Sequence, residues 1–445
     1  MQVRSNSPDP GHRRMTALLQ VTRRARDQIL DKRASLMRYV TSTASMAIGL
    51  VAHTIGFVIL AQTLGPTQFG LLTIVSAVAN FGLVWSGLGS GELLRRKVAR
   101  DTATYPEVLG HAVSILTLTS LAVGVPLSIG LAFAVEVTGD FLTDLLIMLL
   151  FVASNMSMFA WISMTEQILL AHNDVTRANL VNVASGIGRA VAAIVACYIF
   201  KITKLEQWVF WHFGFYLVIA IGCTLVIGPL GRPRGGIIWG ELRRGLTISA
   251  TGLFMFMRRN ADVLALAAVA PPSVVGVYGV ARRIVGTADV VSASLDRLVY
   301  SNLAVAGVKG SGQTLRLASR YAMIAAVLCA ATSIALLIAA PWVPLIFGHR
   351  YADAVLPTQI LAGTLILTSL QNLASDALNA AEQHELRFVA ETTAGLVGTG
   401  LLVVLTLAFA LPGILFAVYL SGLLGVIALW ATLIWRAARE QPQVA

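Results

Sequence analysis

The sequence predicts an all-α polytopic membrane protein with about 12 transmembrane helices. Hydrophobic residues make up 56% of the 445 residues and charged residues only 12%, about half the ~25% that is usual in soluble proteins. The mean hydropathy of +0.76 agrees with this composition. Because so few charges cannot cover a soluble surface, the composition excludes a soluble multidomain enzyme, a nucleic-acid-binding domain and a secreted disulfide-stabilised domain.

The positions of the apolar runs and of the basic residues agree with that number of spans. The runs begin near residues 39, 68, 109, 142, 178, 208, 246, 273, 321, 354, 387 and 412. With a cytoplasmic N-terminus, 25 of the 33 Lys and Arg residues fall on the cytoplasmic side and only Lys201, Lys204 and Arg350 on the other. Cytoplasmic loops of membrane proteins carry such an excess of positive charge. We therefore predict a multi-pass protein of the cytoplasmic (inner) membrane with both termini in the cytoplasm, and the net charge of +11 needs no nucleic-acid partner.

The predicted spans divide the chain into two lobes of six helices each. The divisions are a basic cytoplasmic tail (1–38), an N-terminal lobe (39–230), a basic cytoplasmic linker (231–245), a C-terminal lobe (246–436) and a cytoplasmic C-terminus (437–445). The tail has no cleavage site and is followed by a run of full span length, so it is not a signal peptide. Either an interfacial helix or a disordered segment held by charge fits it.

An internal repeat supports the two lobes. LGPTQFGLL at 64–72 and APPSVVGVY at 270–278 share a Pro, a hydroxyl residue and a Gly at an offset of 206. AHNDVTRA at 171–178 and AEQHELRF at 381–388 share Ala and Arg at an offset of 210. Short turns between helices favour Pro and Gly in any protein, but two matches at similar offsets favour a repeat. Because six is even, the two lobes would cross the membrane in the same direction, with a cavity between them.

Five arginines lie inside predicted spans. They are Arg189, Arg258, Arg259, Arg282 and Arg283. Arg258 and Arg259 are near the middle of the span at 246–270, roughly 18 Å from either end at ~1.5 Å per residue, which is too far to reach water along the helix. A cation at the bilayer centre costs about 2.5–3.5 kcal/mol on insertion scales. We therefore expect these side chains to face water or specific partners.

Two carboxylates are close to these arginines in the sequence. Asp262 follows Arg259 by three residues, and Asp289 follows Arg282 by seven. Complete pairing would make an ionic staple between the lobes, but five cations and two acids favour a wet cavity of net positive charge. Arginine suits phosphate or pyrophosphate because its planar fork donates two hydrogen bonds at once. Asp262 and Asp289 are predicted to orient the arginines or to couple transport to an ion gradient, and His53 is interpreted as a core histidine, with proton coupling as the alternative.

Nothing in the sequence indicates catalysis or a bound cofactor. No G-x-x-x-x-G-K-[ST], H-E-x-x-H or G-x-S-x-G motif occurs, and no loop exceeds about 25 residues. The three cysteines, Cys197, Cys223 and Cys329, fall in apolar runs without metal-ligand spacing. We predict no catalytic residue, no metal site and no cofactor.

Two segments resemble a known family. LAQTLGPTQFGLLTIVSAVANFGLVWSGLGSGELLRR at 60–96 has a short turn, an "FG-L" helix entry, a Gly-rich helix end and an Arg cluster. RRNADVLALAAVAPPSVVGVYGVARRI at 258–284 has an intramembrane Asp before a turn and a "G-Y-x-x-A-x-R" helix, at Asp262, Gly276, Tyr278, Ala281 and Arg283. Both are similar to signatures of the polysaccharide-biosynthesis, O-antigen (Wzx-type) flippases of the multidrug/oligosaccharidyl-lipid/polysaccharide (MOP) superfamily. The resemblance implies two six-helix lobes in a V shape, as in MATE transporters.

The resemblance also implies a function. It predicts a transporter, not an enzyme, that moves a polyprenyl-pyrophosphate-linked oligosaccharide to the outer leaflet by alternating access, for export of O-antigen, capsule or exopolysaccharide. The predicted span number favours these types over the lipid II flippases, which have more spans. The pyrophosphate would bind Arg258, Arg259, Arg282 and Arg283, with Arg189 as a further ligand. The expected partners are the lipid-linked oligosaccharide, membrane lipids and a polysaccharide polymerase or export complex.

Two other functions remain open. A cation-coupled multidrug exporter of the same superfamily would have a cavity dominated by acidic residues. A membrane-embedded glycan polymerase or ligase would carry its working residues on a large outward loop, and no such loop is predicted.

Overall fold

The computed structural model describes residues 10–440. Residues 1–9 and 441–445 lie outside the description, and they include parts of the predicted tail and of the predicted C-terminus. The description also leaves out some side chains, namely those of residues 10–47 and of Ile248, Thr251, Phe254, Met255 and Arg258. Every regular element in residues 10–440 is a helix. The predicted all-α class is therefore confirmed.

The first half of the chain forms α1 to α8. Their bounds are α1 Pro10–Trp85, α2 Ser90–Val98, α3 Tyr105–Thr119, α4 Val125–Ala134, α5 Phe141–Val152, α6 Phe159–Ala171, α7 Val175–Ile194 and α8 Leu205–Ile227. Helix α1 begins inside the predicted tail and is broken at Gly65, whose φ of 68° favours glycine. Pro66 follows and has no N–H to continue the helix, which is why the predicted turn occurs here.

The second half forms α9 to α16. Their bounds are α9 Trp239–Val269, α10 Pro272–Ala288, α11 Val290–Gly307, α12 Ser311–Ala339, α13 Val343–Phe347, α14 Val355–Ala362, α15 Thr364–Ala380 and α16 His384–Glu440. Helix α9 begins inside the predicted linker, and the backbone of α16 is non-helical at Ala410. The connection between the halves packs on α3, because the N–H of Ile238 donates to Nδ1 of His111 at 3.0 Å.

Eight segments of the described chain are long and apolar enough to cross a membrane. Two of them, Ile48–Val98 and His384–Glu440, contain the breaks at Gly65 and Ala410. Helices α9, α10 and α11 are not among the eight, although α9 and α10 carry four of the five arginines that were predicted to lie inside spans. The chain is a multi-pass membrane protein, and the number of 12 spans stays a prediction.

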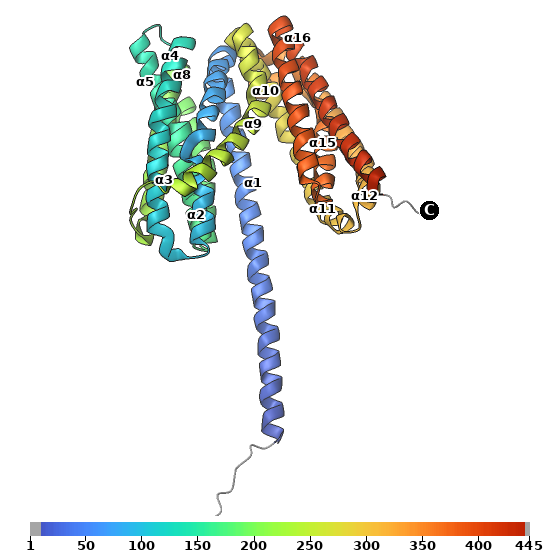
Figure 1. The fold of residues 1–445 in the computed structure, drawn as a ribbon. Coiled ribbons are helices and arrows are strands. Elements are labelled where there is room, and N and C mark those ends of the chain that lie inside the picture. The colour runs from blue at the N-terminus through green and yellow to red at the C-terminus, as the bar shows by residue number, and fades with distance from the viewer. Residues whose placement is uncertain (1–9, 441–445) are drawn as a thin grey trace, which may run out of the picture.

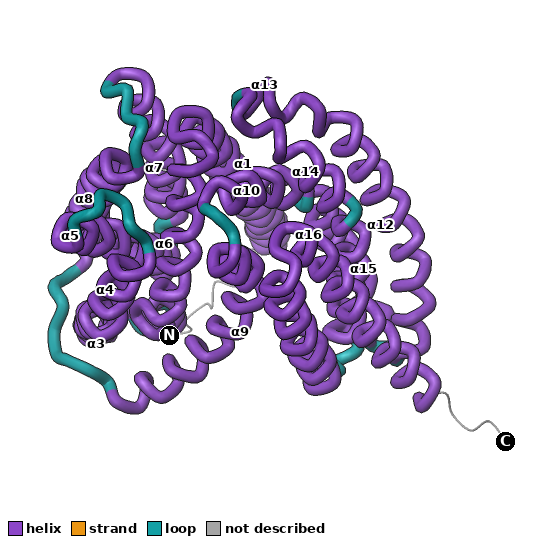
Figure 2. Tube along the Cα trace, turned by 90° about the horizontal axis from the view of Figure 1, so that it is seen from above, coloured by secondary structure: helices purple, strands orange, loops and turns teal. Residues whose placement is uncertain are grey.

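The helices form two groups that diverge like the arms of a V (Figure 1). One group contains α2, α3, α4, α5 and α8, and the other contains α11, α12, α15 and α16, with α1, α9 and α10 between them. Seen from above, α1 and α10 lie next to each other between the groups (Figure 2). The groups lie close at one end of the molecule, here called the closed end, and diverge toward the end from which α1 extends.

The first pair of predicted repeat segments meets at the contact between α1 and α10. A side chain at Gly70 would collide with the carbonyl of Pro272, and a side chain at Gly276 would collide with the carbonyl of Pro66. The glycine of each segment therefore contacts the proline carbonyl of the other segment. This reciprocal contact is what a two-fold relation between the two segments predicts, and both helices can approach closely only because neither glycine has a Cβ.

The second pair of repeat segments has the same turn, shifted by one residue from the predicted match. Asp174 N–H donates to the Leu169 carbonyl, and Gln383 N–H donates to the Leu378 carbonyl, both at 2.9 Å. These hydrogen bonds correspond at an offset of 209, whereas the sequence match used 210. Arg387 therefore corresponds to Ala178 and not to Arg177.

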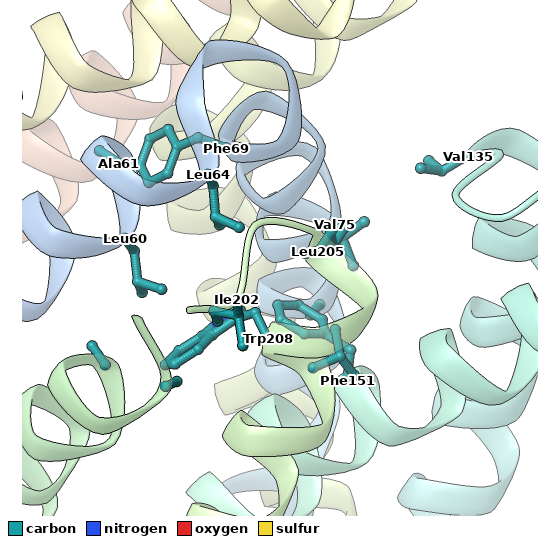
Figure 3. Close-up of a cluster of buried hydrophobic side chains, with 14 of the residues drawn as sticks. Leu60, Ala61, Leu64, Phe69, Val75, Val135, Phe151, Ile202, Leu205 and Trp208 are labelled. Carbon is teal, nitrogen blue, oxygen red and sulfur yellow. The ribbon is translucent and has the colours of Figure 1, made fainter. Parts of the chain in front are cut away.

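Hydrophobic packing joins the halves. One cluster of buried side chains contains Leu60, Phe69 and Trp208 of the first half together with Phe347 and Tyr351 of the second. Figure 3 shows its first-half members, among them Leu60, Phe69, Phe151 and Trp208. The Tyr351 hydroxyl donates to the carbonyl of Ala61 at 3.0 Å, so the polar tip of this buried tyrosine is satisfied.

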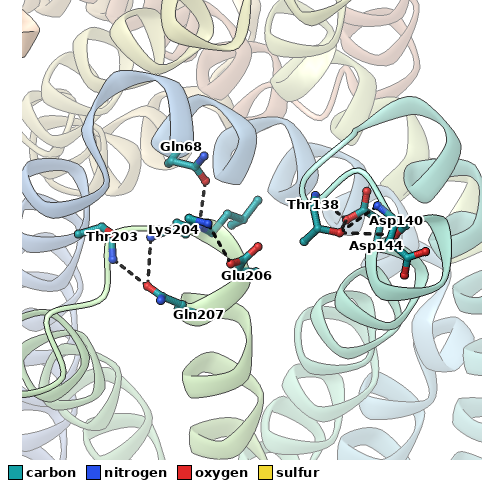
Figure 4. A network of polar contacts seen from close by, with 9 residues as sticks. Gln68, Thr138, Asp140, Asp144, Thr203, Lys204, Glu206 and Gln207 are labelled. Carbon is teal, nitrogen blue, oxygen red and sulfur yellow. Dashed lines mark hydrogen bonds and ion pairs between the residues drawn. The ribbon is translucent and has the colours of Figure 1, made fainter.

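Polar contacts fix the loops of the first half. Gln68 Oε1 accepts the N–H of Leu205 at 2.9 Å, which ties α1 to the start of α8, and Gln207 caps the same turn (Figure 4). Asp144 accepts hydrogen bonds from the N–H and the hydroxyl of Thr138 in the loop before α5. The exposed Asp140 accepts from the hydroxyl and N–H of Thr143, which lowers the pKa of Asp140.

Candidate functional site

Arg189 lies in α7 and has only neutral partners. Its Nη1 is 3.1 Å from Nδ1 of His53, and its Nη2 donates to the hydroxyl of Tyr216. Its guanidinium carbon is 5.4 Å from the centroid of the Tyr216 ring and 6.0 Å from that of Phe159. Its Nε is buried without a hydrogen-bond partner. The charge of Arg189 is stabilised by ring faces and a phenol but is not neutralised.

Arg283 lies in α10, and its charge, like that of Arg189, is not neutralised by a carboxylate. Its guanidinium carbon lies 5.5 Å from the centroid of Phe57, and its Nε is buried without a partner. No carboxylate of the described residues forms an ion pair with Arg189 or Arg283. Both arginines therefore keep a net positive charge inside the helical bundle.

The two arginines approach each other across α1. His53 and Phe57 are one turn apart on this helix, and they contact Arg189 and Arg283 respectively. The charges of both arginines act on His53, and the two guanidinium groups act on each other. Residues from the two halves of the chain thus create one site of positive potential.

Arg282 has the opposite environment. Its Nε is 2.9 Å from Oδ2 of Asp262, and the same oxygen accepts the Tyr278 hydroxyl at 2.8 Å. Its Nη2 donates to the carbonyl of Arg259. The Asp262 side chain is only 10% exposed and pairs with the neighbouring helix rather than with Arg259, three residues before it. This pair neutralises Arg282 and fixes α9 against α10.

Arg259 and Asp289 do not join this site. The side chain of Arg259 is exposed, and that of Arg258 lies outside the described residues. Asp289 ends α10, and its Oδ1 is buried without a hydrogen-bond partner. Within the described residues it forms no ion pair with Arg282, whose carboxylate partner is Asp262.

Carboxylates gather in the second half of the chain. Asp296 in α11 lies within electrostatic range of Asp289 and of Asp376 in α15 and accepts a 3.4 Å hydrogen bond from Asn372. Glu391 in α16 lies 3.8 Å from Arg387. Acidic side chains thus gather in the second half, while Arg189 keeps its charge in the first.

An ionic contact joins the halves outside the predicted spans. Glu241, at the start of α9, lies 3.1 Å from Lys97, 3.4 Å from Arg96 and 3.1 Å from Arg244. Burial acts to raise the pKa of Glu241, but the hydrogen bond and charge of Lys97 and the charge of Arg244 outweigh it and lower the pKa. Glu241 therefore ties α9 to α2 in its ionised form.

The described residues contain no candidate metal site. No group of three or more His, Cys, Asp or Glu side chains within residues 48–440 is placed to hold an ion. Cys197, Cys223 and Cys329 are buried free thiols.

Sequence reasoning missed the aromatic partners of the site. Phe57, Phe159 and Tyr216 lie in apolar helices, where an aromatic residue is most simply explained as core. Tyr278 belongs to the motif quoted for the family resemblance, and the structure places its hydroxyl on Asp262 of the same motif. One signal was available in the sequence. Tyr278 lies four residues before Arg282 on the same helix, and such a spacing places an aromatic residue next to an intramembrane charge.

Solved structures of the MOP superfamily share this fold. An inward-facing MATE family multidrug resistance transporter matches with a TM-score of 0.71 at 16% identity, over 91% of this chain and 100% of that chain. An outward-facing MATE transporter matches with a TM-score of 0.55 at 17% identity, over 90% of this chain and 96% of that chain. The lipid II flippase MurJ, inward closed, matches with a TM-score of 0.66 at 13% identity, over 88% of this chain and 86% of that chain.

No protein-family model matches the sequence, and no curated protein matches it significantly. The structural likeness therefore establishes the fold, which is that of MOP-superfamily transporters and flippases.

Proposed function

We propose that this protein is a flippase that moves a polyprenyl-pyrophosphate-linked oligosaccharide from the cytoplasmic to the outer leaflet by alternating access. The observation that carries the proposal is the pair Arg189 and Arg283, which come from different halves and have no carboxylate partner among the described residues. An uncompensated cation inside a membrane is expensive unless an anion reaches it. A pyrophosphate is such an anion, and arginine binds it with paired hydrogen bonds.

The arrangement of the halves supports entry from the cytoplasm. With the N-terminus in the cytoplasm, the divergent ends of the two helix groups face the cytoplasm and the closed end faces the outer side. The higher TM-score to the inward-facing MATE transporter than to the outward-facing one supports the same state. The pyrophosphate would bind Arg189 and Arg283, the sugars would lie next to the pyrophosphate inside the protein, and the polyprenyl chain would remain in lipid.

The other predicted residues have supporting roles in this proposal. Asp262 neutralises and orients Arg282, so that Arg282 holds α9 against α10. Arg258 and Arg259 lie earlier on α9 and would meet the anion on its way into the site. The protein would act in the inner membrane with a polysaccharide polymerase or export complex.

Charge reversal at Arg283 tests the proposal. Arg283→Glu should abolish polysaccharide export from cells that depend on this protein, while the protein remains present in the membrane, because a carboxylate repels the pyrophosphate. Arg320→Glu makes the same change at an exposed residue of α12 and should export normally. Normal export by Arg283→Glu would refute the assignment.

The carboxylates of the second half favour one alternative, a cation-coupled multidrug exporter. Asp296, which lies within electrostatic range of Asp289 and Asp376, would carry a driving proton there. In that case vesicles containing the purified protein should extrude ethidium when a proton gradient is applied, and Asp296→Asn should stop this. Ethidium transport without movement of a lipid-linked sugar would favour the exporter over the flippase.

A further inference from the structure

A polar pocket lies in the first half, beside the arginine site. It has a volume of about 490 Å³ and lies between the end of α1, the start of α2 and helix α6. The turn Ser86–Gly89 makes one wall, with φ values of 69° at Gly87 and Gly89. Binding pockets for small molecules have volumes of about 300–1,000 Å³, so this one can hold a ligand of that class.

Two of the polar side chains that line the pocket, Ser86 and Ser90, donate to the backbone carbonyls of Met156 and Gly87. The other polar side chains of the pocket are Glu92, Arg95, Ser163 and Gln167, and within the described residues none of them forms a hydrogen bond or an ion pair. Together they provide a carboxylate, a guanidinium, a hydroxyl and an amide. Such a set can both donate and accept hydrogen bonds, and its formal charge is zero.

Phe159 is common to the pocket and the arginine site. This ring lines the pocket, and the guanidinium carbon of Arg189 lies 6.0 Å from its centroid. A ligand with its anionic group on Arg189 can therefore place the atoms next to that group over the face of Phe159 and into the pocket.

We propose that this pocket holds the first sugars of the lipid-linked oligosaccharide, an inference that rests on the flippase proposal. In such a lipid the first sugar is bonded directly to the pyrophosphate, so a sugar pocket must adjoin the anion site. A sugar is neutral and carries many hydroxyls, which matches a pocket of zero formal charge with unpartnered donors and acceptors. The apolar face of a sugar ring would lie on Phe159, with Ser163 and Gln167 bonding its hydroxyls.

The chemistry of the pocket disfavours other occupants. A polyprenyl chain would leave the four polar side chains without hydrogen bonds, which costs about 1–3 kcal/mol for each buried group. A cationic drug would find its one carboxylate, Glu92, near a competing cation, Arg95. The pocket therefore makes the site selective for what is attached to the pyrophosphate, whereas the arginines recognise the pyrophosphate itself.

The test compares two lipids on the purified full chain in nanodiscs. The probes are a polyprenyl pyrophosphate without sugar and the same lipid with one N-acetylglucosamine or one glucose. Wild-type protein should bind at least one sugar-bearing lipid more tightly than the bare lipid. Ser163→Leu should weaken binding of the sugar-bearing lipid by about tenfold, the effect of losing one good hydrogen bond, and so remove this preference. The affinity for the bare lipid should stay unchanged.

Measurements on two further variants decide between the explanations. Ser319→Leu makes the same substitution at an exposed serine of α12 and should keep the preference. Arg189→Gln should weaken binding of the bare and the sugar-bearing lipids alike. If the wild type binds all the lipids equally, or if Ser163→Leu keeps its preference, the sugar pocket is refuted while the flippase stands. If the wild type binds none of the lipids, the flippase proposal itself fails.

Discussion

Arg189 and Arg282 are both arginines inside the bundle, but their partners differ. Arg282 pairs with the Asp262 carboxylate at 2.9 Å, and Tyr278 bonds the same carboxylate oxygen. Arg189 contacts a histidine, a tyrosine hydroxyl and two aromatic rings, and its Nε has no partner. One charge is therefore neutralised within the protein, and the other is left for something outside it.

The difference shows that a cation inside the membrane is not by itself evidence of a binding site. A buried ion pair such as Arg282–Asp262 can serve only to fix two helices. The partners decide which role applies, and aromatic rings stabilise a guanidinium without removing its charge. Arg283 belongs with Arg189, because it too lies on a ring and not on a carboxylate.

The largest expected effect is the difference in lipid affinity between variants that neutralise Arg189 and variants that neutralise Arg282. Arg189→Gln should weaken binding of a bare polyprenyl pyrophosphate at least about tenfold, since hydrogen bonds to charged groups are worth about 1.5–3 kcal/mol. Arg282→Gln should change this affinity much less and lower the melting temperature instead. Equal losses of affinity in the two variants would show that the distinction between them is wrong.

The contact of α1 with α10 at Gly70 and Gly276 should keep Arg189 and Arg283 together. Gly70→Leu or Gly276→Leu would push α1 from α10, because each side chain would meet a proline carbonyl. We expect a several-fold loss of transport and a longer distance between spin labels at Gly139 and Asp353, measured by electron paramagnetic resonance. Gly130→Leu is the matched control, since nothing lies within 4 Å of a Cβ there. Unchanged label distances in Gly70→Leu would contradict the contact.

Removing the carboxylate should affect stability through Arg282. Asp262→Asn leaves Arg282 without its counter-charge and should lower the free energy of unfolding by about 1–3 kcal/mol, followed as a fall in melting temperature. The double variant Asp262→Asn/Arg282→Gln should recover part of that loss, because no unpaired charge remains. A double variant less stable than Asp262→Asn would argue against a structural pair.

The exposed contact at Glu241 should have the smallest effect. Glu241→Gln should lower the free energy of unfolding by about 0.2–1 kcal/mol at pH 7, as for other ion pairs near a surface. The pKa of Glu241 is lowered in the folded protein, so its contribution is complete above the pKa of an unfolded Glu, about 4.3, and is lost as the pH falls below that value. The difference in melting temperature between wild type and variant should stay constant from pH 7 to about pH 5. A difference that grew as the pH fell would contradict the direction of this shift.

The sequence was sufficient to locate the arginines but not their partners. A charge inside an apolar run is conspicuous, so Arg189 and Arg283 could be identified without a structure. The pairing of Asp262 with Arg282 crosses between helices and depends on the angle at which α9 meets α10, which spacing along one helix does not contain. The contact of Arg189 with Tyr216 depends in the same way on the packing of α7 and α8.

Packing also explains the other differences. The predicted turn at Gly65 and Pro66 followed from backbone chemistry and is present. The predicted match between Arg177 and Arg387 is wrong by one residue. It aligned the two turns by the identity of their side chains, whereas the backbone hydrogen bonds that define the turns correspond at an offset of 209. The pocket beside Phe159 could not be predicted, since it is formed by α2 and α6, whose relative position the sequence pattern does not specify.

Transport of a labelled lipid across vesicles tests the role of the two arginines most directly. Vesicles would contain the purified protein and a fluorescent polyprenyl-pyrophosphate-linked sugar in one leaflet, and its arrival in the other leaflet would be followed by chemical quenching. The wild type and Arg320→Glu should move the lipid, and Arg189→Gln/Arg283→Gln should not, although it remains folded. Movement at the wild-type rate by the double variant would show that these arginines do not bind the cargo.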